Sequence, residues 1–112
     1  MKFTLADAHP FGWPGISGQA YSGKEQFARM SAALVTVAGR HGRVLDRVGD
    51  RLYFVLSGTG RFDLNGTTIP VSARDVLIIP RDVPYDYEGQ MEVFLVQSPS
   101  YDPSTEMSLE NA

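Results

Sequence analysis

The stretch "ARDVLIIPRDVPYDY" (Ala73–Tyr87) carries the pattern on which the fold assignment rests. Its apolar run at residues 76–79 has the length of a short strand and stops at Pro80, which has no backbone N–H to donate to a neighbouring strand. A turn with a second proline follows, and the chain resumes at Tyr85 with aromatic residues. This order predicts a strand, a tight turn and the start of another strand.

Short apolar runs of the same kind recur along the chain. They lie at residues 30–39, 51–58, 75–80 and 91–99. Residues 60–71 are typical of a hairpin, because Phe62 and Leu64 alternate with polar residues and Asn65-Gly66 is a strong two-residue turn signal. No segment keeps a helical period over a useful length. Short strands separated by turn signals predict an all-β sandwich or barrel.

The length and composition fit one globular domain. The chain has 112 residues, of which 43% are hydrophobic and 21% charged. Residues 1–23 are rich in glycine, proline and aromatic side chains, so we expect an N-terminal arm with at most one short strand. The barrel is expected at residues 24–98, and the polar residues 99–112 are expected to form a loose C-terminal tail.

The same composition argues against several classes of partner and site. A formal net charge of -3 does not favour binding to a phosphate backbone, so we expect no nucleic-acid partner. The absence of cysteine excludes disulfides, zinc-thiolate sites and thiol nucleophiles. The apolar runs are too short to span a bilayer, and the N-terminus lacks the features of a signal peptide. We therefore expect a cytoplasmic protein with no membrane partner.

A characteristic spacing runs from Gly39 to Gly58. Gly39 is followed by five residues and then by Leu45, Asp46 and Arg47, and after three and six further residues come Arg51 and Gly58. This spacing resembles the first motif of the cupin family, a small β-barrel of the jelly-roll type. In that motif two histidines stand at the positions of Leu45 and Arg47, and a glutamate stands at that of Arg51.

The opening stretch resembles the second cupin motif. Pro80 matches that motif, whereas Arg74 and Asp82 stand in place of its glycines, Tyr85 in place of its histidine and Gly89 in place of its asparagine. The resemblance covers roughly residues 30–98 and implies a small jelly-roll or double-stranded β-helix barrel, preceded here by the N-terminal arm.

The resemblance also implies a changed site. In metal-binding cupins the motif histidines and glutamate hold a divalent ion, but an arginine is always protonated and cannot be a ligand. An Arg51 that points into the barrel would repel a cation. His9 and His41 are the only histidines that could form a replacement ligand set. We therefore expect neither a metal ion nor another cofactor.

Strand alternation suggests what the barrel encloses instead. If Arg51 points inward, so do Tyr53 and Val55, and if Tyr85 points inward, so does Tyr87. The predicted site has Arg51 and Tyr85 as catalytic residues, and Arg47, Tyr53, Tyr87, Leu45, Val55 and Trp13 as ligand-binding residues. The alternative is structural, with tyrosines that fill the core and Arg51 paired to Asp46 or Asp50.

These residues favour a metal-independent cupin that binds a small organic molecule, anionic or carbonyl-bearing. Isomerisation, cyclisation or proton transfer next to a carbonyl is the plausible chemistry. Asp46, Asp50, His41 and Glu88 are candidates for the base, and the sequence does not choose among them. The alternatives are a non-catalytic binding or sensor module and a purely structural role. The apolar arm, with Trp13 over the pocket or in an interface, leads us to expect a homodimer.

Overall fold

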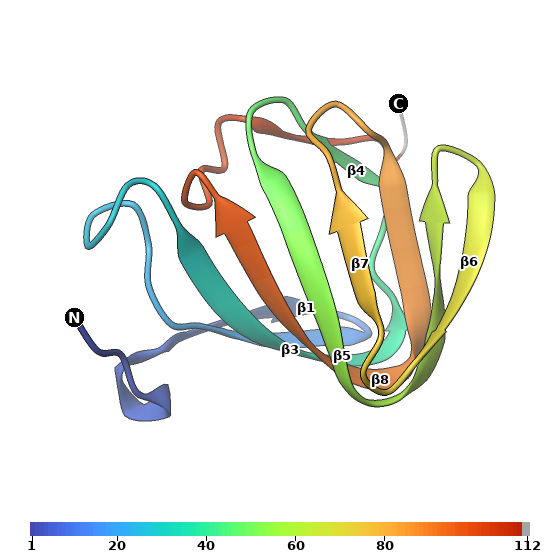
Figure 1. The fold of residues 1–112 in the computed structure, drawn as a ribbon, viewed down its shortest axis with the longest axis horizontal. Coiled ribbons are helices and arrows are strands. Elements are labelled where there is room, and N and C mark those ends of the chain that lie inside the picture. Colours follow the sequence, from blue (N-terminus) through green and yellow to red (C-terminus); the bar gives the residue numbers. More distant parts are fainter. Residues whose placement is uncertain (111–112) are drawn as a thin grey trace.

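The computed structural model describes residues 1–110, and its regular structure is almost entirely β, as expected (Figure 1). The strands are β1 (His9–Trp13), β2 (Ile16–Ala20), β3 (Ser31–Arg40), β4 (Val44–Asp46), β5 (Asp50–Leu64), β6 (Thr67–Ser72), β7 (Val76–Ile79), β8 (Tyr85–Ser98) and β9 (Glu106–Ser108), with a 3-10 turn, η1 (Leu5–Asp7). Within these residues there is no helix of the length and apolarity that crossing a lipid bilayer requires.

Strand β8 organises the barrel. It pairs antiparallel with β5 along its whole length and, on its other edge, with β3 and β4. The first half of β5 carries β7 and its second half carries β6, so two long strands support four shorter ones. The sheet curls round so that its strands enclose an interior (Figure 1). This architecture confirms the predicted small jelly-roll barrel.

Side-chain alternation places the core on the inner face of this curled sheet. The most deeply buried core residues are Tyr53, Val55, Phe62, Val35, Val37, Ile79, Tyr85 and Val93. The predicted inward pairs Tyr53 with Val55 and Tyr85 with Tyr87 are therefore confirmed. The hairpin between β5 and β6 is confirmed too, since Asn65 and Gly66 both have the positive φ that a tight two-residue turn requires.

A β-bulge in β5 was not predicted. The pairing register between β5 and β8 shifts between Val55 and Ser57, so the inward positions change from odd to even numbers, and Phe62 is fully buried. Gly58 follows the bulge with φ +82, and a Cβ there would lie 2.1 Å from the carbonyl oxygen of Gln90. The last glycine of the first motif is thus required by the backbone, independently of any metal.

The two ends of the chain differ from the expectation. Residues 9–20 form a two-stranded hairpin, β1–β2, which pairs with β3 and extends the sheet. The loose tail is wrong for Glu106–Ser108, because these residues form β9 against β4. Pro10 and Gly12 interrupt the alternation of apolar and polar residues in the first segment, so its strands are hard to predict. Strand β9 is too short and too polar to be predicted from the sequence.

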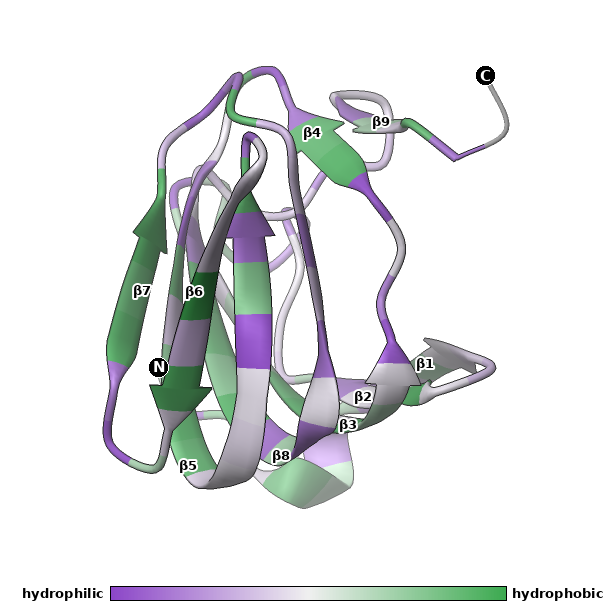
Figure 2. Ribbon diagram, turned by 90° about the vertical axis from the view of Figure 1, so that its right-hand side faces the viewer, coloured by the Kyte–Doolittle hydropathy of each residue, from purple (hydrophilic) through white to green (hydrophobic). Residues whose placement is uncertain are grey.

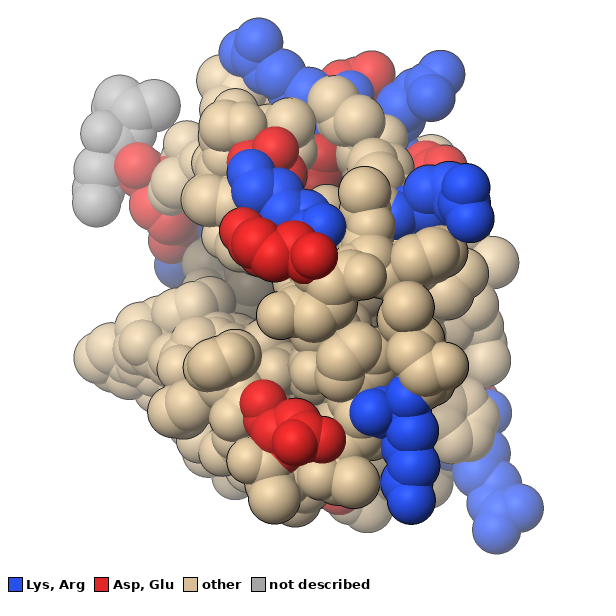
Figure 3. All heavy atoms as spheres, turned by 90° about the vertical axis from the view of Figure 1, so that its left-hand side faces the viewer, with Lys and Arg blue, Asp and Glu red and all other residues tan. Residues whose placement is uncertain are grey.

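The outer surface combines an apolar strand with mixed charge. Strand β7 is hydrophobic along its length, and Val76 and Ile78 on it are 51% and 61% exposed (Figure 2). On the face shown in Figure 3, basic and acidic side chains lie next to one another rather than in a patch of one sign.

Candidate functional site

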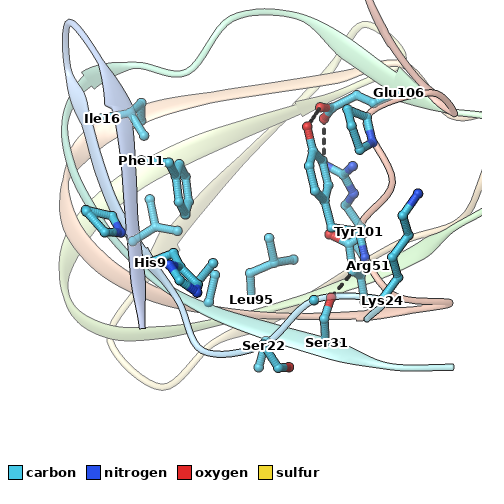
Figure 4. A pocket seen from close by; sticks show the side chains of 18 of the residues that line it. His9, Phe11, Ile16, Ser22, Lys24, Ser31, Arg51, Leu95, Tyr101 and Glu106 are labelled. Carbon is cyan, nitrogen blue, oxygen red and sulfur yellow. Dashed lines mark hydrogen bonds and ion pairs between the residues drawn. The ribbon is translucent and has the colours of Figure 1, made fainter. Parts of the chain in front are cut away.

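The sheet and the two terminal segments enclose a cavity of about 570 Å³. The hairpin β1–β2 forms one wall, the inner faces of β3, β5 and β8 form the floor, and residues 101–106 close the other side. Figure 4 shows Arg51, Tyr101 and Glu106 at one end and Phe11 and Ile16 at the other. A mostly apolar cavity of this size with a few converging polar groups is typical of a site for a small organic molecule.

Arg51 is held by groups of the protein itself. Its guanidinium is 4% exposed and lies 3.0 Å from a carboxylate oxygen of Asp46 and 3.0 Å from one of Glu106. It also donates a hydrogen bond of 2.6 Å to the hydroxyl of Tyr85. Two carboxylates thus balance one cation, and an anionic ligand would have to compete with Glu106. We name Arg51, Asp46, Glu106 and Tyr85 the Arg51 network.

Asp46 is anchored from several sides. It is 4% exposed, and its Oδ1 accepts the backbone N–H groups of Val48 and Gly49 at 2.9 and 2.8 Å. Burial alone would raise the pKa of Asp46, but these backbone hydrogen bonds and the Arg51 guanidinium hold the pKa below its ordinary value. Asp46 is therefore an ionised partner of Arg51 at neutral pH.

The hydroxyls of Tyr85 and Tyr53 extend this network to the cavity. They lie 2.8 Å apart, and Tyr85 also accepts from Arg51. Arginine only donates, so within residues 1–110 the proton of Tyr85 finds its acceptor on Tyr53. With this direction the Tyr53 hydroxyl keeps its own proton for another acceptor, and Tyr53 lines the cavity. Burial raises the pKa of Tyr85 well above its ordinary value, so it stays protonated.

His41 lies on the cavity wall directly after β3. Its ring stacks on Tyr87 with centroids 4.5 Å apart and meets the edge of Trp13 at 5.3 Å. The indole N–H of Trp13 donates to the backbone carbonyl of His41 at 2.9 Å. This contact holds the β1–β2 hairpin beside the histidine. We name His41, Trp13 and Tyr87 the His41 wall.

The protonation of His41 follows from one contact. Its Nδ1 lies 2.7 Å from the carbonyl oxygen of Gly42, and a carbonyl only accepts, so Nδ1 carries the proton and Nε2 keeps its lone pair. Burial lowers the pKa of His41 below its ordinary value of 6.5. His41 is consequently a neutral imidazole at pH 7, with a basic nitrogen available.

The other candidate bases are not available to the cavity. Asp46 is occupied by Arg51, Asp50 is exposed and accepts the backbone N–H of Arg81, and Glu88 pairs with Arg61. None of these three carboxylates lines the cavity. Of the four candidate bases named from the sequence, His41 is the one that lines the cavity.

The structure brings together some of the predicted site residues. Arg51, Tyr53, Tyr87 and Trp13 line the cavity, and Tyr85 reaches it through Tyr53. Val55 points inward as predicted but is fully buried in the core, away from the cavity.

Leu45 and Arg47 do not reach the cavity. Asp46 is the buried, inward residue of this segment, and alternation therefore turns its two neighbours away. Leu45 pairs with Met107 of β9, and the exposed Arg47 contacts the sulfur of the same methionine at 3.2 Å. The motif spacing alone misplaced both residues.

Sequence reasoning missed the cavity residues of the C-terminal segment, Tyr101 and Glu106. The hydroxyl of Tyr101 donates to Glu106 at 3.1 Å, and Glu106 faces Arg51. No local signal marks this segment, because its position depends on the pairing of β9 with β4. Gln97, also on the cavity, was recognisable as an inward position of β8, two residues beyond Leu95.

The comparisons with known proteins agree with this fold. Residues 35–96 match the cupin domain family, and no curated protein matches the chain. The structure of Pac13, a unique nucleoside dehydratase, superimposes with a TM-score of 0.89 at 25% identity, covering 97% of this chain and 90% of that one. KdgF from Halomonas sp. shares the fold at 18% identity, with a TM-score of 0.77, over 91% of this chain and 96% of its own.

Further structures of the Streptomyces Pac13 contain uridine. They match at 24% identity over 97% of this chain and 89% or 90% of that one, with TM-scores of 0.89 or 0.90. In one of these variants a histidine is replaced by glutamine, and in the other two a tyrosine is replaced by phenylalanine.

The residues at the metal positions of the two motifs do not fit a divalent ion. Arg51 places a fixed positive charge there, Leu45 and Arg47 point away, and Tyr85 is a buried phenol hydrogen-bonded to Arg51. Among residues 1–110, no three or more histidine, aspartate or glutamate side chains gather in a way that could hold a metal.

Proposed function

Because the chain belongs to the cupin family, we propose that its cavity binds a small carbonyl-bearing molecule and catalyses proton transfer next to that carbonyl without a metal ion. The observation that carries this proposal is a histidine and a tyrosine on one cavity: His41, whose Nδ1 bonds to the Gly42 carbonyl so that Nε2 keeps its lone pair, and Tyr53, whose hydroxyl bonds to that of Tyr85. The ring of Tyr87 lies between them, with its centroid 4.5 Å from that of His41 and 5.2 Å from that of Tyr53.

The chemistry follows from these two groups. His41 Nε2 removes a proton from the carbon beside the carbonyl, while the Tyr53 hydroxyl donates a hydrogen bond to the carbonyl oxygen as negative charge develops there. If a hydroxyl stands on the next carbon, collapse of the enolate expels it, and the proton on His41 completes a molecule of water. The net reaction is a dehydration. Return of the proton to a different carbon would give an isomerisation.

The charge balance favours a carbonyl over an anionic group as the primary target. Arg51 is neutralised by Asp46 and Glu106, so its role is to polarise Tyr85 and, through it, Tyr53. A neutral carbonyl can accept from Tyr53 without displacing either carboxylate. Arg51 and Tyr85 then act as positioning residues rather than in contact with the ligand.

The walls and the comparisons support a nucleoside-like ligand. Phe11, Trp13 and Tyr87 present aromatic surface to the cavity, which suits a planar ring. Pac13, which is similar over nearly the whole chain, is a nucleoside dehydratase. We therefore propose a nucleoside or related ring-bearing carbonyl compound as the substrate class.

Mass spectrometry and a turnover screen test the proposal together. Molecules released from the purified protein are identified, and carbonyl-bearing nucleosides are incubated with it and followed for loss of water or change of isomer. Conversion of at least one such compound is the expected result. Binding without conversion would favour the sensor function, and neither binding nor conversion would leave a structural role.

We also propose that two copies associate. Val76 and Ile78 are exposed on β7, beside Phe54 and Leu52 of β5, and together they give the sheet an apolar outer face. The β1–β2 hairpin, from which a dimer was expected, instead walls the cavity of its own chain. Light scattering should show a dimer that Ile78→Glu dissociates, and a wild-type monomer at micromolar concentration would contradict the proposal.

A further inference from the structure

Gln97 lines the cavity with a carboxamide that no protein group of residues 1–110 holds. It lies on β8, is 4% exposed and lines the cavity, yet no residue of the described chain hydrogen-bonds to its carboxamide. Its two cross-strand neighbours are Arg51 and Ser31, which line the same end of the cavity (Figure 4). Its amide nitrogen and oxygen are not among the buried polar atoms that lack a partner, so they are open to the cavity, where a ligand or water can hydrogen-bond to them.

The neighbours of Gln97 are already engaged. The Oγ of Ser31 accepts the backbone N–H of Tyr101 at 3.0 Å, and Arg51 is held by Asp46, Glu106 and Tyr85. Beside these two neighbours, the carboxamide is the group whose donor and acceptor are both left for a ligand. It presents a donor and an acceptor side by side, which matches a partner group that carries one of each.

The position of Gln97 relative to the reacting groups is set by strand geometry. The cross-strand partner of Tyr53 is Leu95, and Gln97 is the next inward residue of β8. Two residues of an extended strand span about 7 Å. A ligand that reaches both groups must therefore carry its carbonyl and its donor–acceptor edge in different parts of the molecule.

We propose that Gln97 is a specificity residue that recognises the edge of a ring amide, in which an N–H stands next to a carbonyl. The N3–H and adjacent carbonyl of a uracil ring have this pattern. The inference rests on the proposed function, because it assigns the base-like part of the nucleoside-like ligand to the Gln97 end. Tyr53 and His41 then act on the part that carries the reactive carbonyl.

The test compares uridine with 3-methyluridine, in which a methyl group replaces the N3 proton. Calorimetric titration should show that the wild-type protein binds uridine on the order of tenfold more tightly, the difference made by one buried hydrogen bond. Gln97→Leu should bind the two nucleosides equally. Gln97→Met, which keeps the unbranched chain, serves if the leucine variant does not fold. Gln90→Leu is the control, since Gln90 is exposed on the same strand, and it should keep the wild-type preference.

The outcomes separate the two proposals. Equal binding of both nucleosides by the wild type, or a preference retained by the Gln97 variants, would overturn the role of Gln97 while leaving turnover at His41 intact. A wild-type protein that binds neither nucleoside at millimolar concentration, yet converts another carbonyl compound, would also overturn it. Loss of all turnover with a retained uridine preference would instead overturn the proposed function alone.

Discussion

At one end of the cavity Arg51 meets two carboxylates and a phenol, whereas the His41 wall consists of side chains that are neutral at pH 7. The Arg51 network is internally satisfied apart from the Nε of Arg51, the one buried side-chain polar atom in residues 1–110 without a partner. The His41 wall keeps a basic nitrogen uncommitted. The comparison teaches that the most strongly charged group of the site has its partners within the protein, while the neutral side chains include one nitrogen that is open to a ligand.

The largest expected effect is on folding. Arg51→Ala leaves the buried carboxylate of Asp46 without its cation, which should lower the free energy of unfolding by about 3–5 kcal/mol. Arg47→Ala is the matched control, because Arg47 is exposed, and it should change stability by less than about 0.5 kcal/mol. Denaturant unfolding measures both. Equal stabilities would show that the Arg51 network is not structural.

The second expected effect is on turnover. His41→Gln keeps a polar side chain of similar size but removes the base, so kcat should fall by about 10²- to 10⁴-fold while ligand affinity changes little. Glu88→Gln, which alters a carboxylate away from the cavity, should leave kcat unchanged. A His41 variant with wild-type kcat would show that another residue is the base. The proposed difference in reactivity between the His41 wall and the Arg51 network would then be wrong.

A smaller effect on turnover is expected at Tyr85, whose hydroxyl connects Arg51 to Tyr53. Tyr85→Phe removes the hydroxyl that passes the donation of Arg51 to Tyr53, and kcat should fall about tenfold, equivalent to one hydrogen bond. KM should change less than kcat, because Tyr85 does not line the main cavity. Tyr53→Phe should cost more in kcat than Tyr85→Phe. The reverse order would make Tyr85 the residue that contacts the ligand, as predicted from the sequence.

The smallest effect is a pH dependence. The pKa of His41 is lowered below 6.5 by burial, so the base is neutral at pH 7 and activity should decline only as the pH falls through this lowered value. By the same linkage, the unfolded chain takes up the proton first, and the stability associated with a neutral His41 is present above pH 6.5 and lost on acidification. Titration of the His41 ring by NMR checks the sign, and a value above 6.5 would contradict it.

The sequence by itself determined the scaffold. Alternating apolar residues, the Asn65-Gly66 turn and the proline at the end of β7 depend on local geometry, and all of them stand in the structure as expected. Alternation also placed Arg51 with Tyr53 and Tyr85 with Tyr87 on the inner face. These inferences succeed because a strand repeats every two residues whatever it packs against.

Only the tertiary structure decided which groups are free to act. Glu106 comes from a tail strand, and its contact with Arg51 spans 55 residues of sequence. Asp46, rather than its neighbours Leu45 and Arg47, faces inward, and the indole N–H of Trp13 bonds to the backbone carbonyl of His41, 28 residues away in sequence. Folding places one carboxylate oxygen of Asp46 and one of Glu106 3.0 Å from the guanidinium of Arg51. Whether a buried charge is neutralised, and which group donates a proton to which, depends on contacts that folding creates. A sequence motif records the positions of such groups along the chain but not their partners.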